Sequence, residues 1–405
     1  MDPRARPGEV IAVSAIGRDR RGLIAALSGT VTDLGGNIVH VEQSSIAGLF
    51  SMFMLVEPEN LPPGLDAYRF AYELSMRGRD LGLDVRAEVE RPESAASRVD
   101  KDLRVITIVG SDKPGVMHAI ASTLAQAGAN IERLHHVARG DFMAFDILAD
   151  VRGVDFERLR HDLRATCERV GVDAVVQPDS MFRTRKRLVV FDMDSTIVDG
   201  EVIDELAHAA GVGSVVSEIT AKAMRGEIDF QEALKARVRL LKGLRVEDLE
   251  RIADSLKLTP GTFDLVTTLK AMGFRLALIS GGFTFFTDRL KRDLGFDHAF
   301  ANELEIKDGV VTGEVVGGII DMARKGEILR ELAALEGLTR DEVVAIGDGA
   351  NDQVMIRNAG LGIAFNAKDI LKRAADGSIS KSNIRGLLYA LGATTADVKR
   401  FTGDA

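Results

Sequence analysis

The chain has 405 residues, of which 46% are hydrophobic and 28% are charged, and its formal net charge is −9 at pH 7. The length predicts two to four domains, and this ordinary composition excludes an intrinsically disordered chain. A negative balance without a long basic stripe argues against a nucleic-acid partner, and apolar runs far shorter than the roughly 20 residues of a membrane span argue against a membrane protein.

The N-terminal segment Met1–Glu9 carries no apolar stretch of the kind found in signal peptides. Cys167 is the single cysteine, so no intrachain disulfide can form. Both features predict a cytoplasmic protein. The thiol is expected to pack in a core rather than to act as a nucleophile.

The N-terminal half contains a repeat with an offset of 93 residues. Each copy is expected to begin with a strand, at Val10–Ile16 and at Leu103–Val109, followed by a glycine-containing loop and a helix. A hairpin of two strands and a second helix follow. The predicted order of each copy is βαββαβ. The aligned segments are Ile16–Leu23 with Val109–Val116 and Gly35–Ile38 with Gly128–Ile131.

This repeat resembles the ACT domain, a ferredoxin-like module that commonly binds amino acids where two modules pair. The resemblance covers residues 9–92 and 101–180, and the loop Asp112–Gly115 carries it best. The first copy departs from the pattern, because Arg20 and Arg21 stand where lysine and proline are expected.

A ligand site in these modules would form around the glycine loops. Gly22 and Gly115 would let the backbone approach a small ligand at the start of a helix, where free N–H groups attract a carboxylate. The same loop residues also suit turn and cap positions, and both interpretations stay open. The candidate partners for an ammonium group are Asp19, Asn37, Asp112 and Asn130.

Beyond residue 183, and up to 396, apolar strands alternate with amphipathic helices, which predicts a parallel sheet covered on both faces. Polar residues follow three of the strands, so their side chains are expected to meet at one edge of the sheet. The expected strands are Arg187–Phe191, Arg275–Ile279, His298–Ala301 and Val343–Ile346.

These polar residues resemble the motifs of the haloacid dehalogenase superfamily in order and setting. They are Asp192 with Asp194, then Ser280, then Lys325, and lastly Asp348 with Asn351 and Asp352. Taken singly, Ser280 also suits a helix cap, Lys325 a solvated charge and Asp348 a turn. The resemblance implies an α/β fold with a Rossmann-like core and a helical cap, preceded by the two ACT domains.

The resemblance also implies phosphoryl transfer through an aspartyl phosphate. Asp192 would attack phosphorus, and Asp194 would act first as general acid and then as general base. Lys325, the Ser280 hydroxyl and the Gly281 N–H would stabilise the phosphate oxygens, and Asn351 would contact the substrate.

Mg²⁺ is the expected cofactor, since it prefers oxygen ligands. The resemblance implies that it is held by the Asp192 carboxylate, the Asp194 main-chain carbonyl and the Asp348 carboxylate. Asp352 would orient these ligands.

Residues 200–258 show helical periodicity and are expected to form the cap that excludes water and selects the substrate. The pattern in cap and core is similar to that of the phosphoserine phosphatases. By this resemblance Glu201 pairs with the substrate ammonium, Arg237 pairs with its carboxylate, and Met224 and Phe230 form an apolar wall. The last two residues also suit simple packing within the cap.

The implied reaction is hydrolysis of O-phospho-L-serine to L-serine, with L-serine as the expected regulatory ligand of the ACT domains and a homodimer as the expected assembly. Two rivals stay open at this stage. One is a phosphatase or phosphotransferase of the same fold that acts on another small ester or on phosphorylated proteins. The other is an amino-acid-sensing protein whose C-terminal half only binds phosphate.

Overall fold

The structure, a computed structural model, describes residues 9–58, 61–90, 101–138, 142–179, 186–380 and 383–402. The chain forms two compact units, Met1–Asp100 and Lys101–Ala405. The segment before Glu9, the expected module ends at 92 and 180, and the expected start of the third region at 183 lie outside the described residues.

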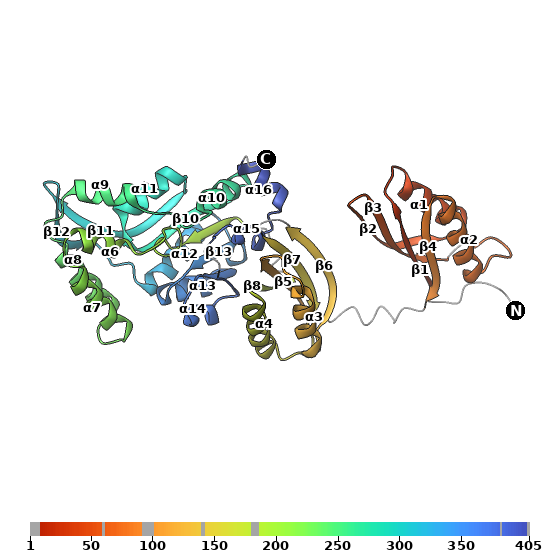
Figure 1. Ribbon diagram of the computed structural model, residues 1–405, viewed down its shortest axis with the longest axis horizontal. Coiled ribbons are helices and arrows are strands. Elements are labelled where there is room, and N and C mark those ends of the chain that lie inside the picture. The colour runs from red at the N-terminus through yellow and green to blue at the C-terminus, as the bar shows by residue number, and fades with distance from the viewer. Residues whose placement is uncertain are drawn as a thin grey trace. The chain divides into compact units, whose positions relative to one another are not determined.

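The first unit is a βαββαβ module, as the repeat predicts (Figure 1). Its antiparallel sheet has the strand order β2-β3-β1-β4. Leu27 and Phe70, one from each helix, are fully buried in the module's core. The elements are β1 (Val10–Arg18), α1 (Leu23–Asp33), β2 (Asn37–Ile46), β3 (Leu49–Glu57), α2 (Ala67–Asp80) and β4 (Leu83–Glu90).

The second module repeats this topology at the start of the second unit. Its strands follow the equivalent order β6-β7-β5-β8. The elements are β5 (Leu103–Gly110), α3 (Val116–Gln126), β6 (Asn130–Ala138), β7 (Met143–Asp150), α4 (Phe156–Val170) and β8 (Val172–Pro178).

The remainder of the second unit is built on a mostly parallel sheet with the order β12-β11-β10-β9-β13-β14-β15, in which β12 is antiparallel to β11. Helices α10 and α11 pack on one face, and α12, α13 and α14 pack on the other (Figure 1). The strands are β9 (Leu188–Phe191), β10 (Arg275–Phe283), β11 (His298–Lys307), β12 (Val310–Val316), β13 (Val343–Gly347), β14 (Leu361–Phe365) and β15 (Gly377–Ile379). The helices are α10 (Thr262–Ala271), α11 (Thr284–Leu294), α12 (Met322–Leu335), α13 (Gln353–Asn358), α14 (Asp369–Ala374), α15 (Gly386–Ala390) and α16 (Thr395–Thr402), with 3₁₀ turns η2 (Arg340–Glu342) and η3 (Ala350–Asp352).

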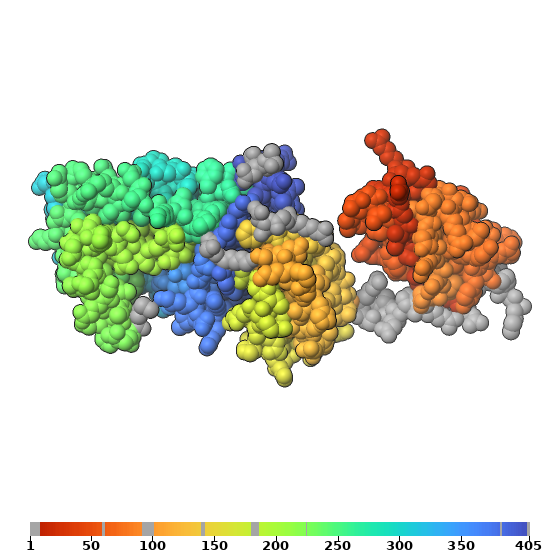
Figure 2. Space-filling view, in the orientation of Figure 1, coloured from red at the N-terminus to blue at the C-terminus, as the bar shows by residue number. Residues whose placement is uncertain are grey.

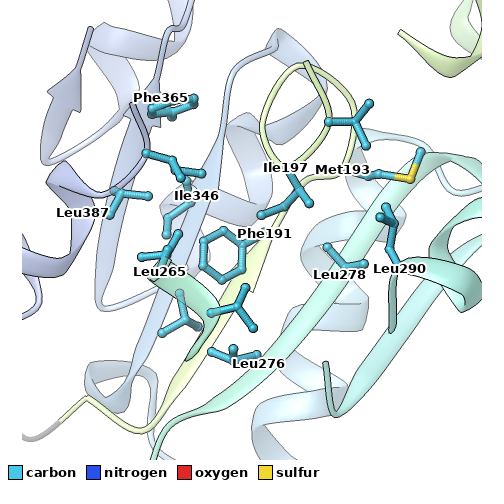
Figure 3. Close-up of a cluster of buried hydrophobic side chains, with 14 of the residues drawn as sticks. Phe191, Met193, Ile197, Leu265, Leu276, Leu278, Leu290, Ile346, Phe365 and Leu387 are labelled. Atoms are coloured by element: carbon cyan, nitrogen blue, oxygen red, sulfur yellow. The ribbon is translucent and has the colours of Figure 1, made fainter. Parts of the chain in front are cut away.

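Both faces of the central strand are buried, which explains why β9 reads as an unbroken apolar run. Val189 and Phe191 face one hydrophobic cluster, whereas Leu188 and Val190 face the other. Figure 3 shows Phe191 within the first cluster, between side chains of β10, β13 and α10. This packing fixes the strand whose end carries the first aspartate.

The second module shares the sheet of the core, because β8 pairs antiparallel with β15 and the two sheets form one of eleven strands. Gly377 lies so close to Val175 that a Cβ atom at position 377 would be 2.6 Å from the Val175 Cα. Arg160 and Arg164 of α4 donate to the carbonyls of Ala375 and Lys372 at the end of α14. In Figure 2 the yellow residues of the module lie directly against the blue C-terminal part of the core.

Residues 200–258 form four helices between β9 and β10, as the periodicity predicts: α6 (Val202–Ala209), α7 (Gly213–Met224), α8 (Phe230–Leu240) and α9 (Val246–Ser255). The two ends of this cap are tied together, since the Asp199 N–H donates to the Lys257 carbonyl at 2.8 Å. Among the described residues, no helix combines the length and the apolar character that crossing a bilayer requires.

The predicted fold class is confirmed: an α/β core with a helical cap follows two ferredoxin-like modules. The sequence analysis missed β12, β14 and β15. It also gave no hint that the second module and the core would share one sheet.

Candidate active site

The site lies where β9, β10 and β13 end, at the edge of the sheet that the sequence predicts. The three strands are parallel, so their carboxyl ends meet. Asp192 directly follows β9, Asp348 directly follows β13, and Ser280 lies close to the end of β10. The segments therefore meet although they are far apart in sequence.

Lys325 is the centre of the charge arrangement. Its side chain from α12 is fully buried, and its Nζ lies 2.8 Å from Asp192 Oδ1 and 2.7 Å from Asp352 Oδ1. Burial acts to lower the pKa of Lys325, but the two carboxylates outweigh burial and raise the pKa above its usual range. Lys325 is thus a buried group between two carboxylates, not a solvated surface charge.

Three carboxylates gather around this cation. Asp192, Asp348 and Asp352 each offer an oxygen, and these oxygens lie within 4.8 Å of one another. Burial, and after it the charge of Asp192, raises the pKa of Asp348 to about 8. Burial and Asp192 likewise raise the pKa of Asp352. A cluster of three carboxyl groups offers only oxygen ligands, which a hard divalent cation prefers.

Asp352 is already engaged by the protein. Its Oδ1 accepts from Lys325, and its Oδ2 accepts from the Gly349 N–H at 3.2 Å. Asp192 Oδ1 accepts from Lys325 and from the Met193 N–H at 2.8 Å, whereas none of the described residues donates to Asp192 Oδ2. The second oxygen of Asp192 is therefore available to a ligand.

Asp194 lies between core and cap. Its Oδ1 accepts from the Val202 N–H at the start of α6, and its Oδ2 accepts from the Ser280 hydroxyl at 3.3 Å. Burial, followed by the charges of Glu201 and Asp192, raises the pKa of Asp194 to about 8. A carboxyl group in this environment can carry a proton near neutral pH.

Strand β10 is irregular after Ile279, where its register with β11 shifts, and residues 280–282 of this irregular part are named the glycine turn. Ser280 Oγ accepts from the Gly282 N–H at 2.8 Å while its own hydroxyl points to Asp194. The Phe230 ring would lie only 3.3 Å from a Cβ atom at position 281, so a glycine allows the cap to approach this turn closely. Ser280 thus contacts Asp194, and Gly281 faces Phe230 of the cap.

Glu201 and Arg237 bring opposite charges to the cap side of the site. The charge of Arg237 acts to lower the pKa of Glu201, and the charge of Glu201 acts to raise the pKa of Arg237. Among the described residues, however, no ion pair joins the two side chains. Partial burial and then Asp192 raise the pKa of Glu201, whose Oε1 accepts from the Ser195 hydroxyl at 3.1 Å. Burial lowers the pKa of Arg237, which donates to the Ala233 carbonyl.

The other predicted contacts are less defined. Phe230 begins α8, is half-buried and faces Gly281, while Asn351 is half-buried in η3 beside Gly349. Met224 ends α7, but its side chain lies outside the described residues. Cys167 is buried in the second module, and burial raises the pKa of its thiol to about 12.

Sequence reasoning missed two polar groups of the site. The backbone N–H of Val202 has no sequence signature of its own, although the Gly200–Glu201 step before a helical pattern could have indicated a helix start. Asn302 of β11 is 1% exposed and bonds to the glycine turn, but a single asparagine in an apolar strand carries no recognisable motif.

The structure separates the candidate residues of each ACT module into two groups. Asp112 follows the end of β5, whereas Asn130 opens β6 opposite Asp150, which pairs with Leu103 at the start of β5. A strand of this length keeps the two groups roughly 25 Å apart. Asp19 and Asn37 are separated in the same way in the first module.

A small ligand inside one module therefore cannot contact both groups, and the assignment of these residues to a ligand site stays a prediction. A site that uses both needs the loop of one module and the strand start of another. Gly22 and Gly115 share the same left-handed conformation, with φ of 89° at both helix starts.

Comparison with known proteins identifies the class. The family model described as haloacid dehalogenase-like hydrolase matches residues 186–360, and the ACT domain model matches residues 9–88 and 102–177. A solved haloacid dehalogenase family hydrolase, t0658 from Salmonella enterica serovar Typhi, is similar over 71% of this chain and 98% of its own, with a TM-score of 0.64 and 28% identity. Fold and site therefore define a haloacid dehalogenase-like hydrolase with ACT domains.

Two curated relatives narrow the class further. A phosphoserine phosphatase of Archaeoglobus fulgidus is 48% identical, and the match covers 85% of this chain and 97% of the relative. A phosphoserine phosphatase of Streptomyces coelicolor is 37% identical, with coverage of 96% and 93%. The chain belongs to the phosphoserine phosphatase family.

Proposed function

We propose that the chain catalyses the Mg²⁺-dependent hydrolysis of O-phospho-L-serine to L-serine and phosphate, through an aspartyl phosphate (an acyl phosphate) formed on Asp192. One observation supports this proposal most strongly. The fully buried Lys325 holds Asp192 Oδ1 at 2.8 Å within a cluster of three carboxylates, at the end of a buried strand.

Asp192 is the proposed nucleophile. Because Oδ1 accepts two hydrogen bonds, Oδ2 is the atom that would form the bond to phosphorus as the bond between phosphorus and the serine oxygen breaks. Asp194 would give its proton to the departing serine oxygen. It would then take a proton from the water that cleaves the aspartyl phosphate.

The metal site is proposed at the carboxylate cluster. Asp192 and Asp348 would supply carboxylate oxygens and Asp194 its main-chain carbonyl, while Asp352, held by Lys325 and Gly349, would orient them. Bound Mg²⁺ would supply positive charge that neutralises the phosphate oxygens. Lys325, Ser280 and the Gly281 N–H would hold the same phosphate group, and Asn351 would contact the substrate.

The charges of the cap match a zwitterionic amino acid. A guanidinium group pairs well with a carboxylate, so Arg237 would bind the carboxylate of phosphoserine, and Glu201 would bind its ammonium group. Phe230 and Met224 would form the apolar wall between them. Since no ion pair joins Glu201 to Arg237 among the described residues, each can take a partner from the substrate.

Phosphate release from O-phospho-L-serine tests the proposal directly. The full chain is assayed with Mg²⁺ and after treatment with a chelator, together with a panel of esters that lack the carboxylate, the ammonium group or both. We expect release that requires Mg²⁺ and prefers phosphoserine. Release of phosphate from other esters only, or from none, would disprove the substrate assignment.

Regulation by L-serine and a homodimeric assembly are also proposed. The second loop, with Asp112 and Gly115, would bind serine together with the start of a strand from a paired module. In the second module Asn130 stands at such a strand start. The first loop, with Asp19 and Gly22, departs from the family pattern at Arg20 and Arg21, and Asn37 opens the strand β2 of that module. A reducing compartment, the cytoplasm, suits the single buried Cys167.

Serine inhibition measured on the Asp112→Ala variant tests the regulatory proposal. We expect the inhibition constant for serine to rise while turnover without serine stays at the wild-type value. The matched control is Asp162→Ala, a half-buried position on α4 of the same module. Identical inhibition of all three proteins would remove the second loop from the regulatory site.

A further inference from the structure

Asn302 lies in β11, one strand beyond the strand that carries Ser280, and is 1% exposed. Its side-chain NH₂ donates to the carbonyls of Gly281, at 2.8 Å, and Gly282, at 3.2 Å. Its Oδ1 accepts from the Ile320 N–H at 2.7 Å. Two carbonyls on one side and one N–H on the other define the orientation of the amide.

The first pair of bonds sets the direction of the glycine turn. In a planar trans peptide, the carbonyl of Gly281 and the N–H of Gly282 point in opposite directions. When Asn302 draws the carbonyl away from the site, the Gly282 N–H must point toward it, where it donates to Ser280 Oγ at 2.8 Å. The Ser280 hydroxyl is thereby left to point to Asp194.

The third bond reaches the element that carries the lysine. Ile320 precedes Asp321, the N-cap of α12, and the Lys325 N–H donates to the Asp321 carbonyl at 2.9 Å. One buried amide therefore joins the turn that presents Ser280 and Gly281 to the start of the helix that presents Lys325. These two elements hold the phosphate group in the proposed reaction.

We propose that Asn302 is a positioning residue that fixes the distance between the glycine turn and Lys325, so that both contact the same phosphate group. The inference rests on the proposed phosphatase function. Asparagine alone among the side chains of this size supplies two donors and one acceptor in this arrangement. A leucine would leave the carbonyls of Gly281 and Gly282 and the N–H of Ile320 without this partner, and an ionised aspartate would oppose the two carbonyl oxygens.

The experiment compares Asn302→Leu and Asn302→Asp with the wild-type chain in the presence of Mg²⁺. The measured quantities are kcat/KM for phosphoserine and for p-nitrophenyl phosphate, the inhibition constant for inorganic phosphate, and the thermal midpoint. Leu269→Ala, a fully buried position of α10 away from the site, controls for lost stability. Asn302→Asp serves where the leucine variant does not fold.

We expect kcat/KM to fall by about 10- to 100-fold for both esters by the same factor, because a misplaced phosphate group affects them equally. The inhibition constant for phosphate should rise. The Leu269→Ala variant should lose thermal stability and keep all three kinetic constants. If the Asn302 variants change only the thermal midpoint, as this control does, the positioning role is wrong. A wild-type chain without phosphatase activity would instead refute the proposed function.

Discussion

At the scale of single residues, the site is governed by how buried charges are paired. Lys325 contacts two of the three clustered carboxyl groups, so these groups outnumber the one cation beside them. Removing water from such groups is costly unless a partner compensates. This residue-level arrangement is what makes a divalent cation and a phosphate group suitable ligands.

Replacing Asp192 with asparagine removes the proposed nucleophile while keeping the size of the side chain. Turnover should fall by roughly 10³-fold or more, since catalytic residues that act together lose most of their effect when one is removed. Phosphate release from phosphoserine measures this loss, and circular dichroism verifies the fold. Turnover that survives the substitution would rule out a covalent intermediate on this residue.

Replacing Arg237 with alanine should change the choice of substrate rather than the chemistry. Losing a partly buried charge partner costs about 2 to 5 kcal/mol, so kcat/KM for phosphoserine should fall roughly 30-fold or more. An ester without a carboxylate should be hydrolysed as before. Arg239→Ala, an exposed position of the same helix, is the control. An unchanged preference for phosphoserine would refute the role of Arg237.

At the scale of secondary structure elements, the catalytic edge of the sheet could be predicted and its other edge could not. Strands β9 and β13 are apolar on both faces and are followed by aspartates. A run of hydrophobic residues before Asp192 or Asp348 therefore predicts each strand from the sequence. Strand β15 has three residues and forms mainly through its neighbours β14 and β8. Such dependence on tertiary contacts leaves no local signal.

The same reasoning separates predictable from unpredictable site residues. Asp194 and Ser280 belong to motifs whose chemistry is visible in the sequence. The Val202 N–H and the Asn302 amide contribute through backbone direction and burial, which only the folded chain displays.

The close approach of β15 to β8 predicts a strong effect at Gly377. In Gly377→Ala, the new Cβ would meet the backbone of Val175, and overpacking of this kind costs about 1 to 3 kcal/mol. Urea unfolding followed by circular dichroism should show an earlier transition. Gly213→Ala in α7, where nothing beyond the chain neighbours and the helix's own backbone lies within 4 Å of the added Cβ, should unfold no earlier than the wild type. Equal urea midpoints for the two variants would contradict close packing between β15 and β8.

At the scale of the whole molecule, the two modules are integrated differently. The first belongs to a compact unit of its own, whereas the second is part of the unit that contains the entire candidate active site. Residues of the second module even join the hydrophobic cluster of the core, as Val109 and Phe142 do.

A chain that begins at Lys101 should therefore fold and keep wild-type turnover of phosphoserine. A chain that begins at Lys186 should aggregate, because it lacks β8 and exposes the edge of β15. Size-exclusion chromatography and the phosphate assay measure both outcomes. Loss of turnover in the longer of these two chains would show that the first unit contributes to catalysis.

The strand pairing between β8 and β15 also limits how the two copies of the repeat can diverge. Val175 and Arg160 in the second copy must stay complementary to the phosphatase surface, so mutations there have to be matched across the junction. Strand β4 of the first copy ends a four-stranded sheet of its own, whereas β8 continues into the sheet of the core. The second copy therefore evolves under a constraint that comes from the catalytic sheet itself.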